Sequence, residues 1–324
     1  MAGLPPTSAL REFPQLHRLA MLSPSNQSLV ADYLANMQAR HFAAASLEGV
    51  MRALKSFAVL TPASRQAVLY EDLSQTTPAD IDAWIDASFQ SGLAASTVDT
   101  RRRCLRGFFT FLQGQGHMTL SPIHDRRHQI IVPQGLPRPM PEEALIAFFH
   151  VIDSLRDRTL FLLMLRCGLR VSETSGLSWS AIDLERGAIR IDTSKGQVDR
   201  VVYIAPDLDT ALRQWRGLQG PEAHYVFPSS FQRKQGQPIT ARQIRLRMTQ
   251  YLKAAQIPPL YSPHSLRHSF ATQLLNAGAS LETVKELMGH RHLEMTLRYA
   301  QLYDHTKRAQ YDAAMAQVEG RQQL

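Results

Sequence analysis

The chain has 324 residues, a length typical of about two domains, and 44% of them are hydrophobic. That apolar fraction is enough for packed cores and excludes a wholly disordered chain. The 36 Lys and Arg residues outnumber the 28 Asp and Glu residues, so the formal charge is +8, and 30 of the 36 cations are Arg. This positive balance favours an anionic partner, in the first place nucleic acid. The bias towards arginine fits phosphate contact, although GC-rich coding is another source of it.

The first half of the sequence predicts helices. Apolar residues recur with helical spacing from Val30 to Met37, and again from Leu47 to Phe57 after a candidate N-cap at Ser46. Residues 77–80, Thr-Pro-Ala-Asp, combine an N-cap, a first-turn proline and a capping-box acid, which together begin a third helix.

A similar start at residues 96–99 predicts a fourth helix, with apolar residues inward and arginines on its flank and opposite face. The inward residues are Leu105, Phe108, Phe109 and Leu112, and the arginines are Arg102, Arg103 and Arg106. We therefore expect an N-terminal extension over residues 1–23 and a small all-α domain over residues 24–125.

A basic, proline-rich stretch follows this domain. It contains Pro133, Pro137, Pro139 and Pro141 together with Arg126, Arg127 and Arg138. Because proline interrupts both helices and sheets, we predict a semi-rigid linker over residues 126–141.

The second half, residues 142–324, is expected to be mostly helical with one small antiparallel β-sheet. Short β-branched runs occupy residues 182–184, 188–191 and 201–204, and turn signals at 185–187 and 194–196 separate them. A helical pattern marked by Leu160, Leu163, Met164 and Cys167 precedes them, and helices resume from about residue 240 to the end, including the last 21 residues, 304–324.

The same pass along the chain excludes several classes of protein. The longest apolar run, Leu160 to Leu165, is far too short to span a bilayer, and residues 1–6 lack the pattern of a secretory signal. Cys104 and Cys167 lie on separate predicted helices and form neither a disulfide framework nor a zinc cluster. We expect a cytoplasmic protein with no membrane association.

Two clusters of functional residue types lie in the first part of the second half. Arg170 follows a helix that ends at Gly168, and Glu173 comes three residues later. Lys195 lies in the predicted turn between two strands. Taken singly, Arg170 and Glu173 are typical of a surface ion pair, and a lysine in a turn is usually just solvated.

A third cluster begins a later helix. After Ser262 and Pro263, which suit an N-cap and a first helical position, His264 and Arg267 lie on one face of the first turns, beside backbone N–H groups that attract anions. His264 and His268 are also spaced to hold a metal, but the catalytic Glu and the acidic third ligand of such a site are missing.

The fourth cluster is His290, after a helix that Gly289 ends, with Tyr299 on a further predicted helix. Together the four clusters would surround one anion with two arginines, two histidines and a lysine, and arginine forks bind phosphate oxygens. Neither an acidic cluster suited to Mg²⁺ nor a Walker loop accompanies them. We therefore expect phosphoryl chemistry with a protein nucleophile, for which Tyr299 is the unassigned candidate.

These motifs, in this order and spacing, resemble those of the tyrosine recombinases, the phage integrase family. The similarity covers residues from about 160 to 300, and the N-terminal half is similar to the family's SAM-like core-binding domain by architecture alone. The resemblance implies a mainly α fold of the two-domain type. It consists of an all-α core-binding domain, then a mostly helical catalytic domain with a small antiparallel sheet over residues 142–324.

The resemblance also implies a site-specific recombinase that cuts and rejoins DNA through a 3′-phosphotyrosyl intermediate, without ATP, metal or another cofactor. In that mechanism Tyr299 is the nucleophile, Arg170 and Arg267 clamp the phosphate, and Lys195 protonates the leaving 5′-oxygen. His264 and His290 would hydrogen-bond the phosphate, and His264 would also help to take the tyrosyl proton. Glu173 would orient Arg170 or a histidine.

The implied partners are duplex DNA with specific recombination sites and further subunits, as a tetramer on two sites or with a closely related recombinase. The C-terminal helix would dock on a neighbouring subunit or on its own. Candidate phosphate contacts are Arg102, Arg103, Arg106, Arg126 and Arg127, for which a merely solvated polar face is the alternative.

Other functions fit part of the pattern. A non-enzymatic DNA-binding regulator explains the charge and the helices but not the set of Arg, His, Lys and Tyr motifs. A type IB topoisomerase shares the chemistry but relaxes DNA without pairing two sites, and a metal-dependent hydrolase built on His264 and His268 is a third alternative. The sequence leaves open whether the role is integration, excision, transposition, inversion or dimer resolution.

Overall fold

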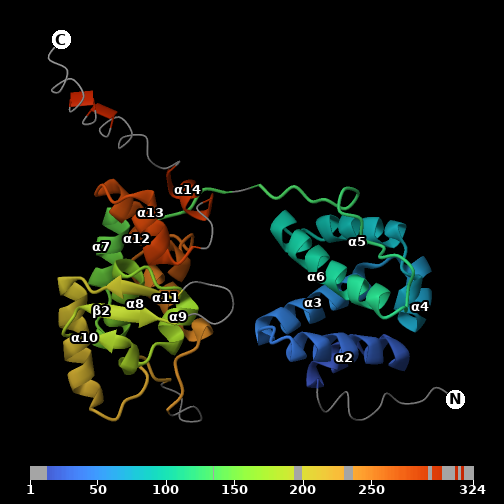
Figure 1. Ribbon diagram of the computed structural model, residues 1–324, viewed down its shortest axis with the longest axis horizontal. Helices are drawn as coiled ribbons and strands as arrows, with labels where there is room; N and C mark the ends of the chain where they lie inside the picture. The colour runs from blue at the N-terminus through green and yellow to red at the C-terminus, as the bar shows by residue number, and fades with distance from the viewer. Residues whose placement is uncertain are drawn as a thin grey trace. The chain divides into compact units, whose positions relative to one another are not determined.

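The computed structural model of the chain describes residues 13–133, 135–192, 199–229, 236–290, 294–300, 311–312 and 315–316. The chain divides into two compact units, Met1–Gln134 and Gly135–Leu324, and the division falls inside the proline-rich stretch (Figure 1). None of the helices in the described ranges combines the length and apolar character that crossing a bilayer requires.

The described part of the first unit is helical, and its helices pack around one apolar core. Its elements are η1 (Pro14–Leu19), α2 (Pro24–Ala39), α3 (Ala44–Leu60), α4 (Ala63–Glu71), η2 (Leu73–Gln75), α5 (Pro78–Gln90) and α6 (Ala95–Gly114). The aromatic rings of Phe57, Trp84, Phe108 and Phe109 meet edge to face at its centre.

Two of the predicted helix starts in this unit are wrong and one is confirmed. Thr77 caps α5 through the expected capping box with Asp80. However, α3 begins after Ala43 and not after Ser46, and α6 already includes Ser96. Helix α4 was not predicted, because only Leu69 of its nine residues is buried and its apolar pattern is therefore weak.

The core of the first unit extends beyond residues 24–125. Phe13, Leu16, Leu19 and Leu22, which belong to the predicted extension, are buried in it, as is Ile123 at the other end. The described part of the extension is thus integral to the packing of this unit, so its removal would expose apolar surface of the core.

The second unit combines helices with the small sheet. Its helices are α7 (Glu142–His150), α8 (Leu155–Arg166), α9 (Val171–Gly176), η3 (Trp179–Ala181), α10 (Pro206–Gln219), α11 (Ala241–Ala254), α12 (Pro263–Asn276), α13 (Leu281–Met288) and α14 (Glu294–Ala300). The strands are β1 (Ile182–Asp183), β2 (Ala188–Ile191) and β3 (Arg200–Tyr203). This mixture confirms the predicted fold class.

The three strands form an antiparallel sheet in the order β1-β2-β3, with Ile189 opposite Val202 and Ile191 opposite Arg200. Successive side chains of a strand point to opposite faces, and here Ile189, Ile191 and Val202 turn inward to the core. Arg200 turns inward with them, which is an exceptional position for a charged residue.

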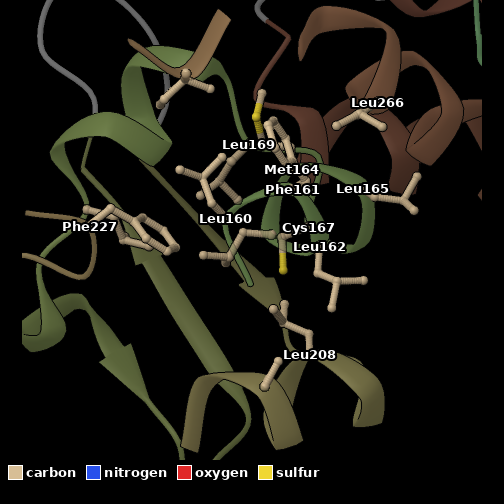
Figure 2. Packing of buried hydrophobic residues seen from close by; sticks show 14 of the residues in the cluster. Leu160, Phe161, Leu162, Met164, Leu165, Cys167, Leu169, Leu208, Phe227 and Leu266 are labelled. Atoms are coloured by element: carbon tan, nitrogen blue, oxygen red, sulfur yellow. The ribbon is translucent and has the colours of Figure 1, made fainter. Parts of the chain in front are cut away.

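Helix α8 lies at the centre of this unit and packs against both α10 and α12. All of its residues from Thr159 to Leu165 are buried. Figure 2 shows the apolar side chains of α8 that it labels, from Leu160 to Leu165, near Leu208 of α10, Leu266 of α12 and Phe227. Because α8 is fixed on several sides, the turn that follows it is held rigidly, and this turn carries the first of the predicted site residues.

Candidate active site

Arg170 is presented by a tight turn between α8 and α9. Gly168 adopts the left-handed conformation there, with φ of 62°, and a Cβ at this position would lie 2.4 Å from the ring of Phe270. Arg170 then caps α9, and the carboxylate of Glu173 accepts hydrogen bonds from the backbone N–H and the Nη1 of Arg170, at 2.7 and 2.8 Å. The predicted pairing of Arg170 with Glu173 is therefore present, in a site and not on an open surface.

Arg267 lies in the second turn of α12 and is completely buried. Its Nη1 and Nη2 donate to the carbonyl oxygens of Gly168 and Met288, so the side chain joins the end of α8 to the end of α13. Its Nε is buried, and no group in the described part of the structure accepts a hydrogen bond from it. A buried donor in this condition is satisfied when a ligand oxygen reaches it.

His290 follows the left-handed Gly289 that ends α13, as the sequence predicted. The carbonyl of Gly289 accepts a hydrogen bond from Nη2 of Arg170 at 3.3 Å, which brings the two segments together. The His290 ring is 8% exposed, and its Nδ1 lies 3.0 Å from Oγ1 of Thr296 on α14. Arg170 and His290 are thus neighbours although 120 positions separate them in the chain.

Tyr299 lies on α14 and is only 3% exposed. Its hydroxyl is 2.6 Å from Nδ1 of His268, and its ring stacks near His290 with centroids 6.4 Å apart. The ring of His264, one turn earlier on the exposed side of α12, is centred 4.3 Å from that of His268. The contacts with His268 and His290 therefore hold the phenol between α12 and the turn after α13.

Burial and mutual repulsion tune the charges of the site. Burial, followed by the charge of Arg170, lowers the pKa of Arg267 to about 9, so its guanidinium is still protonated at neutral pH. Burial, followed by the charge of Arg267, lowers the pKa of His290 to about 3. His290 is therefore neutral at physiological pH and offers hydrogen bonds, whereas the positive charge comes from the arginines.

The carboxylate of Glu173 offsets part of this positive charge. Burial on its own would raise the pKa of Glu173, but hydrogen bonds and charge from Arg200, then from Arg170, lower it to about 2. Arg200 was not among the predicted site residues. An arginine at the start of a strand reads as an exposed residue in sequence, and only the fold brings it to Glu173.

The structure brings most of the predicted catalytic residues together, and one of them lies outside the described residues. Arg170, Glu173, His264, Arg267, His290 and Tyr299 form the cluster described above. Lys195 lies within residues 193–198, outside the described residues. His268, which the sequence suggested only as one half of a weak metal pair, contacts the tyrosine, and the described residues contain no cluster of three or more potential metal ligands.

The three α6 arginines proposed as phosphate contacts differ in accessibility, and Arg102 is not exposed as such a contact requires. Arg102 is 9% exposed and pairs with Asp99 at 2.9 Å, because it falls on the same helical face as the buried Val98 and Leu105. Arg103 and Arg106 have half or more of their side chains exposed.

The two linker arginines are also exposed at the surface of the first unit. Arg126 is exposed, while Arg127 forms an ion pair with Asp82 on α5 at 2.5 Å. An exposed pair of this kind is worth little and exchanges readily for another anion. Arg126 and Arg127 therefore stay candidates for phosphate contact, together with Arg103 and Arg106.

Comparison with known proteins gives the family. The sequence model of the phage integrase family matches residues 140–306, just over half of the chain. Tyrosine recombinase XerC of Xylella fastidiosa (strain M23) is 34% identical over 241 residues, which cover 73% of this chain and 80% of that protein. The chain belongs to the phage integrase family. As a member of this family it is a tyrosine recombinase, in agreement with the resemblance seen in the sequence.

A second relative and two solved structures are also similar to the chain. Tyrosine recombinase XerD of Pseudomonas aeruginosa is 36% identical over 220 residues, 63% of this chain and 69% of that protein. The fold is shared with the Tn1549 transposon integrase in complex with transposon right end DNA, at a TM-score of 0.68 and 19% identity, over 90% of this chain and 98% of that one. A lambda integrase dimer bound to a COC′ core site has a TM-score of 0.66 and 18% identity, over 84% of this chain and 76% of that one.

Proposed function

We propose that this phage integrase family member cuts and rejoins DNA strands at specific sites through a 3′-phosphotyrosyl intermediate on Tyr299. The observation that carries the proposal is the convergence of Arg170, Arg267, His290 and Tyr299, from four separate segments, on one buried cluster. Such a cluster concentrates positive charge and hydrogen-bond donors around a phenol, an arrangement suited to attack on a phosphodiester.

In the proposed cleavage step, the Tyr299 oxygen attacks a backbone phosphorus. A new P–O bond to the tyrosine forms, the P–O bond to the 5′-oxygen breaks, and the 5′-oxygen receives a proton, for which Lys195 is the proposed donor. The phosphodiester energy is conserved in the phosphotyrosyl bond. Attack by a 5′-hydroxyl of another strand then reverses the step and yields the exchanged strand.

The two arginines and His290 would hold the phosphate during both steps. Arg170 is partly exposed, with 22% of its side chain accessible, so its guanidinium can exchange contacts with solvent for contacts with DNA. Arg267 would contribute its buried Nε, a donor that a non-bridging oxygen would satisfy. Neutral His290 would add a hydrogen bond without adding charge.

The proton of Tyr299 must leave as the P–O bond forms. The family resemblance implies a part in this transfer for His264, but the hydroxyl contacts His268, at 2.6 Å. We propose that His268 accepts the proton first. His264, whose ring adjoins that of His268, would then pass a proton on toward solvent. The contact also fixes the orientation of the phenol before DNA arrives.

The partners follow from this chemistry and from the relatives. The named relatives are tyrosine recombinases, and the matched integrase structures hold DNA. We propose that the substrate is duplex DNA carrying specific sites and that four subunits, identical or closely related, act on two sites. The helix predicted over 304–324 would dock on a neighbouring subunit or on its own. The place of action would be the cytoplasm.

The first test is to trap the adduct where the protein works. The tagged protein would be isolated from its host under denaturing conditions, and the covalently bound DNA would be sequenced. We expect one family of related sequences, each joined to the protein at a single position. A non-enzymatic regulator would yield no covalent DNA, and a topoisomerase would yield unrelated sequences and relax plasmids that lack any of them.

The proposed DNA contacts of the first unit predict a graded response to salt. Each arginine that neutralises a phosphate steepens the dependence of log affinity on log salt by about 0.9. The double variant Arg103→Gln/Arg106→Gln should therefore have a slope that is shallower by about 2. Arg102→Gln should leave the slope unchanged, since Arg102 is buried against Asp99. The measurement is non-covalent binding to the trapped sequence at several salt concentrations.

Arg52→Gln is the matched control for this experiment, because Arg52 is an exposed arginine of the same unit that lies 4.0 Å from Glu48 on α3. Its slope should equal that of the parent protein. Equal slopes for the parent and the Arg103/Arg106 double variant would show that these arginines are only a solvated surface.

A further inference from the structure

Arg200 is a buried cation that the proposed reaction does not use. It begins strand β3 and is 7% exposed, on the face of the sheet that carries the apolar Val202 into the core. Burying a guanidinium is unfavourable unless its donors find partners. The partners of Arg200 therefore indicate why it is there.

The side-chain hydrogen bonds of Arg200 to the described residues lead to the candidate site. Nη1 and Nη2 donate to Oε1 and Oε2 of Glu173, at 3.0 and 2.7 Å, as a bidentate fork. Nε donates to the carbonyl oxygen of Leu287, at 2.8 Å. A Cβ at Gly289 would lie 3.0 Å from Cδ and Nη1 of Arg200, so the backbone before His290 packs directly on this side chain.

Glu173 connects Arg200 to Arg170. Among the described residues its carboxylate accepts two hydrogen bonds from Arg200 and two from Arg170. Arg170 in turn donates to the carbonyl of Gly289, which closes a ring of contacts from β3 through α9 to the turn after α13. Without Arg200 the carboxylate would keep hydrogen bonds only to its i,i+3 neighbour Arg170, with Arg267 at 4.0 Å, which leaves its rotamer less restricted.

We propose that Arg200 is a positioning residue for strand cleavage, which fixes the Glu173 carboxylate and the Gly289 turn and thereby sets Arg170 and His290 against the scissile phosphate. The inference rests on the proposed function, since it takes Arg170 and His290 as the groups that hold the phosphate. A buried ion pair commonly adds little to stability compared with apolar side chains of similar size, so its value here lies in geometry.

A double-mutant cycle tests the proposal. Single-turnover cleavage would be measured on a nicked duplex of the sequence trapped in the host, for Arg200→Met, Glu173→Gln and the double variant. We expect each single variant to be slower by roughly tenfold or more, and the double variant to be no slower than the slower single one, because coupled residues are not additive. Arg190→Met is the control: it removes an exposed arginine from the neighbouring strand and should leave the rate unchanged.

The pH profile separates positioning from a merely structural role. The charged groups that face Glu173 are Arg170 on the turn before α9, Arg200 on β3 and Arg267 on α12. Removing Arg200 leaves the carboxylate buried with less positive charge, so its pKa rises from about 2. The rate of Arg200→Met should therefore begin to fall on acidification at a higher pH than the parent rate does, and this difference should be absent when Glu173→Gln is also present.

The possible outcomes decide the matter. Additive losses, or a difference in pH profile that persists when Glu173→Gln is also present, would overturn the positioning role. If Arg200→Met does not fold, as thermal unfolding would show, Arg200→Lys enters the same cycle, because a lysine keeps the charge but loses the fork. If the parent protein itself forms no adduct with this duplex, the proposed function fails first, and this result is distinct from a failure of the Arg200 proposal.

Discussion

The Tyr299→Phe variant is expected to form no covalent adduct with nicked DNA while it binds the same duplex as tightly as the parent protein. Only the phenolic oxygen is removed, and this is the atom that would bond to phosphorus. A nick placed just 3′ of the cleavage site lets the short fragment that carries the freed 5′-hydroxyl diffuse away, so the parent protein accumulates as adduct. The measurement is the fraction of labelled DNA that migrates with the protein on a denaturing gel.

The control for this variant must show that the fold survives. The hydrogen bond to His268 is worth about 1 kcal/mol of the free energy of unfolding, so the melting temperature should change little without it. Tyr251→Phe is the matched variant, since its hydroxyl also makes one hydrogen bond, to Asp157 at 2.9 Å, away from the cluster. Tyr251→Phe should form the adduct normally, and adduct formation by Tyr299→Phe would disprove the nucleophile assignment.

The Arg267→Lys variant is expected to cleave DNA about a hundredfold more slowly than the parent, or worse, although it keeps a positive charge. Arg267 donates to the carbonyls of Gly168 and Met288 at once and has Nε left for a ligand. One ammonium group cannot reproduce this fork. Single-turnover cleavage rates of the two proteins at saturating protein concentration would measure the effect.

Stability must be measured beside the rate of this variant. The two carbonyl oxygens left without their donors are buried, and each such loss destabilises the fold by about 1–3 kcal/mol. Rates are therefore compared well below the melting temperature of the variant. Arg166→Lys is the control, because Arg166 forms an exposed ion pair with Asp207 and should tolerate the change. A near-normal rate for folded Arg267→Lys would contradict the clamp.

Local sequence signals were sufficient for much of the fold. The capping box at Thr77, the three strand segments and the glycine that ends α13 were all identified, because each depends on residues within a few positions of one another. The start of α3 was missed, since tertiary packing of its apolar face lets the helix begin at Ala44 despite the better capping residue Ser46. Helix α10 was missed although Leu208, Ala211 and Leu212 have helical spacing.

The part of the site that could be predicted consists of residues that belong to short sequence motifs. Arg170, Arg267, His290 and Tyr299 stand at motif positions whose order and spacing are informative, and the fold then gathers them. The burial of Arg102 shows that a charged residue type does not by itself predict an exposed side chain. The aliphatic part of an arginine packs well on an apolar face when its guanidinium pairs with a carboxylate, here that of Asp99.

Contacts between distant segments lay beyond the sequence motifs. Arg200 meets Glu173, and His268 meets Tyr299, only because the strand, the helices and the turn after α13 pack together. No periodicity or capping rule specifies such pairs, and one sequence offers no covariation to suggest them. These two residues are accordingly where the structure adds most to the mechanism.

The central claim is that the oxygen of Tyr299 becomes joined to a DNA phosphate. The most direct measurement is mass spectrometry of the trapped adduct after nuclease and protease digestion, which locates the residue that carries the nucleotide. We predict a 3′-linked nucleotide on the peptide that contains Tyr299. A nucleotide on any other residue, or a free 3′-hydroxyl at the break in the DNA, would contradict the mechanism.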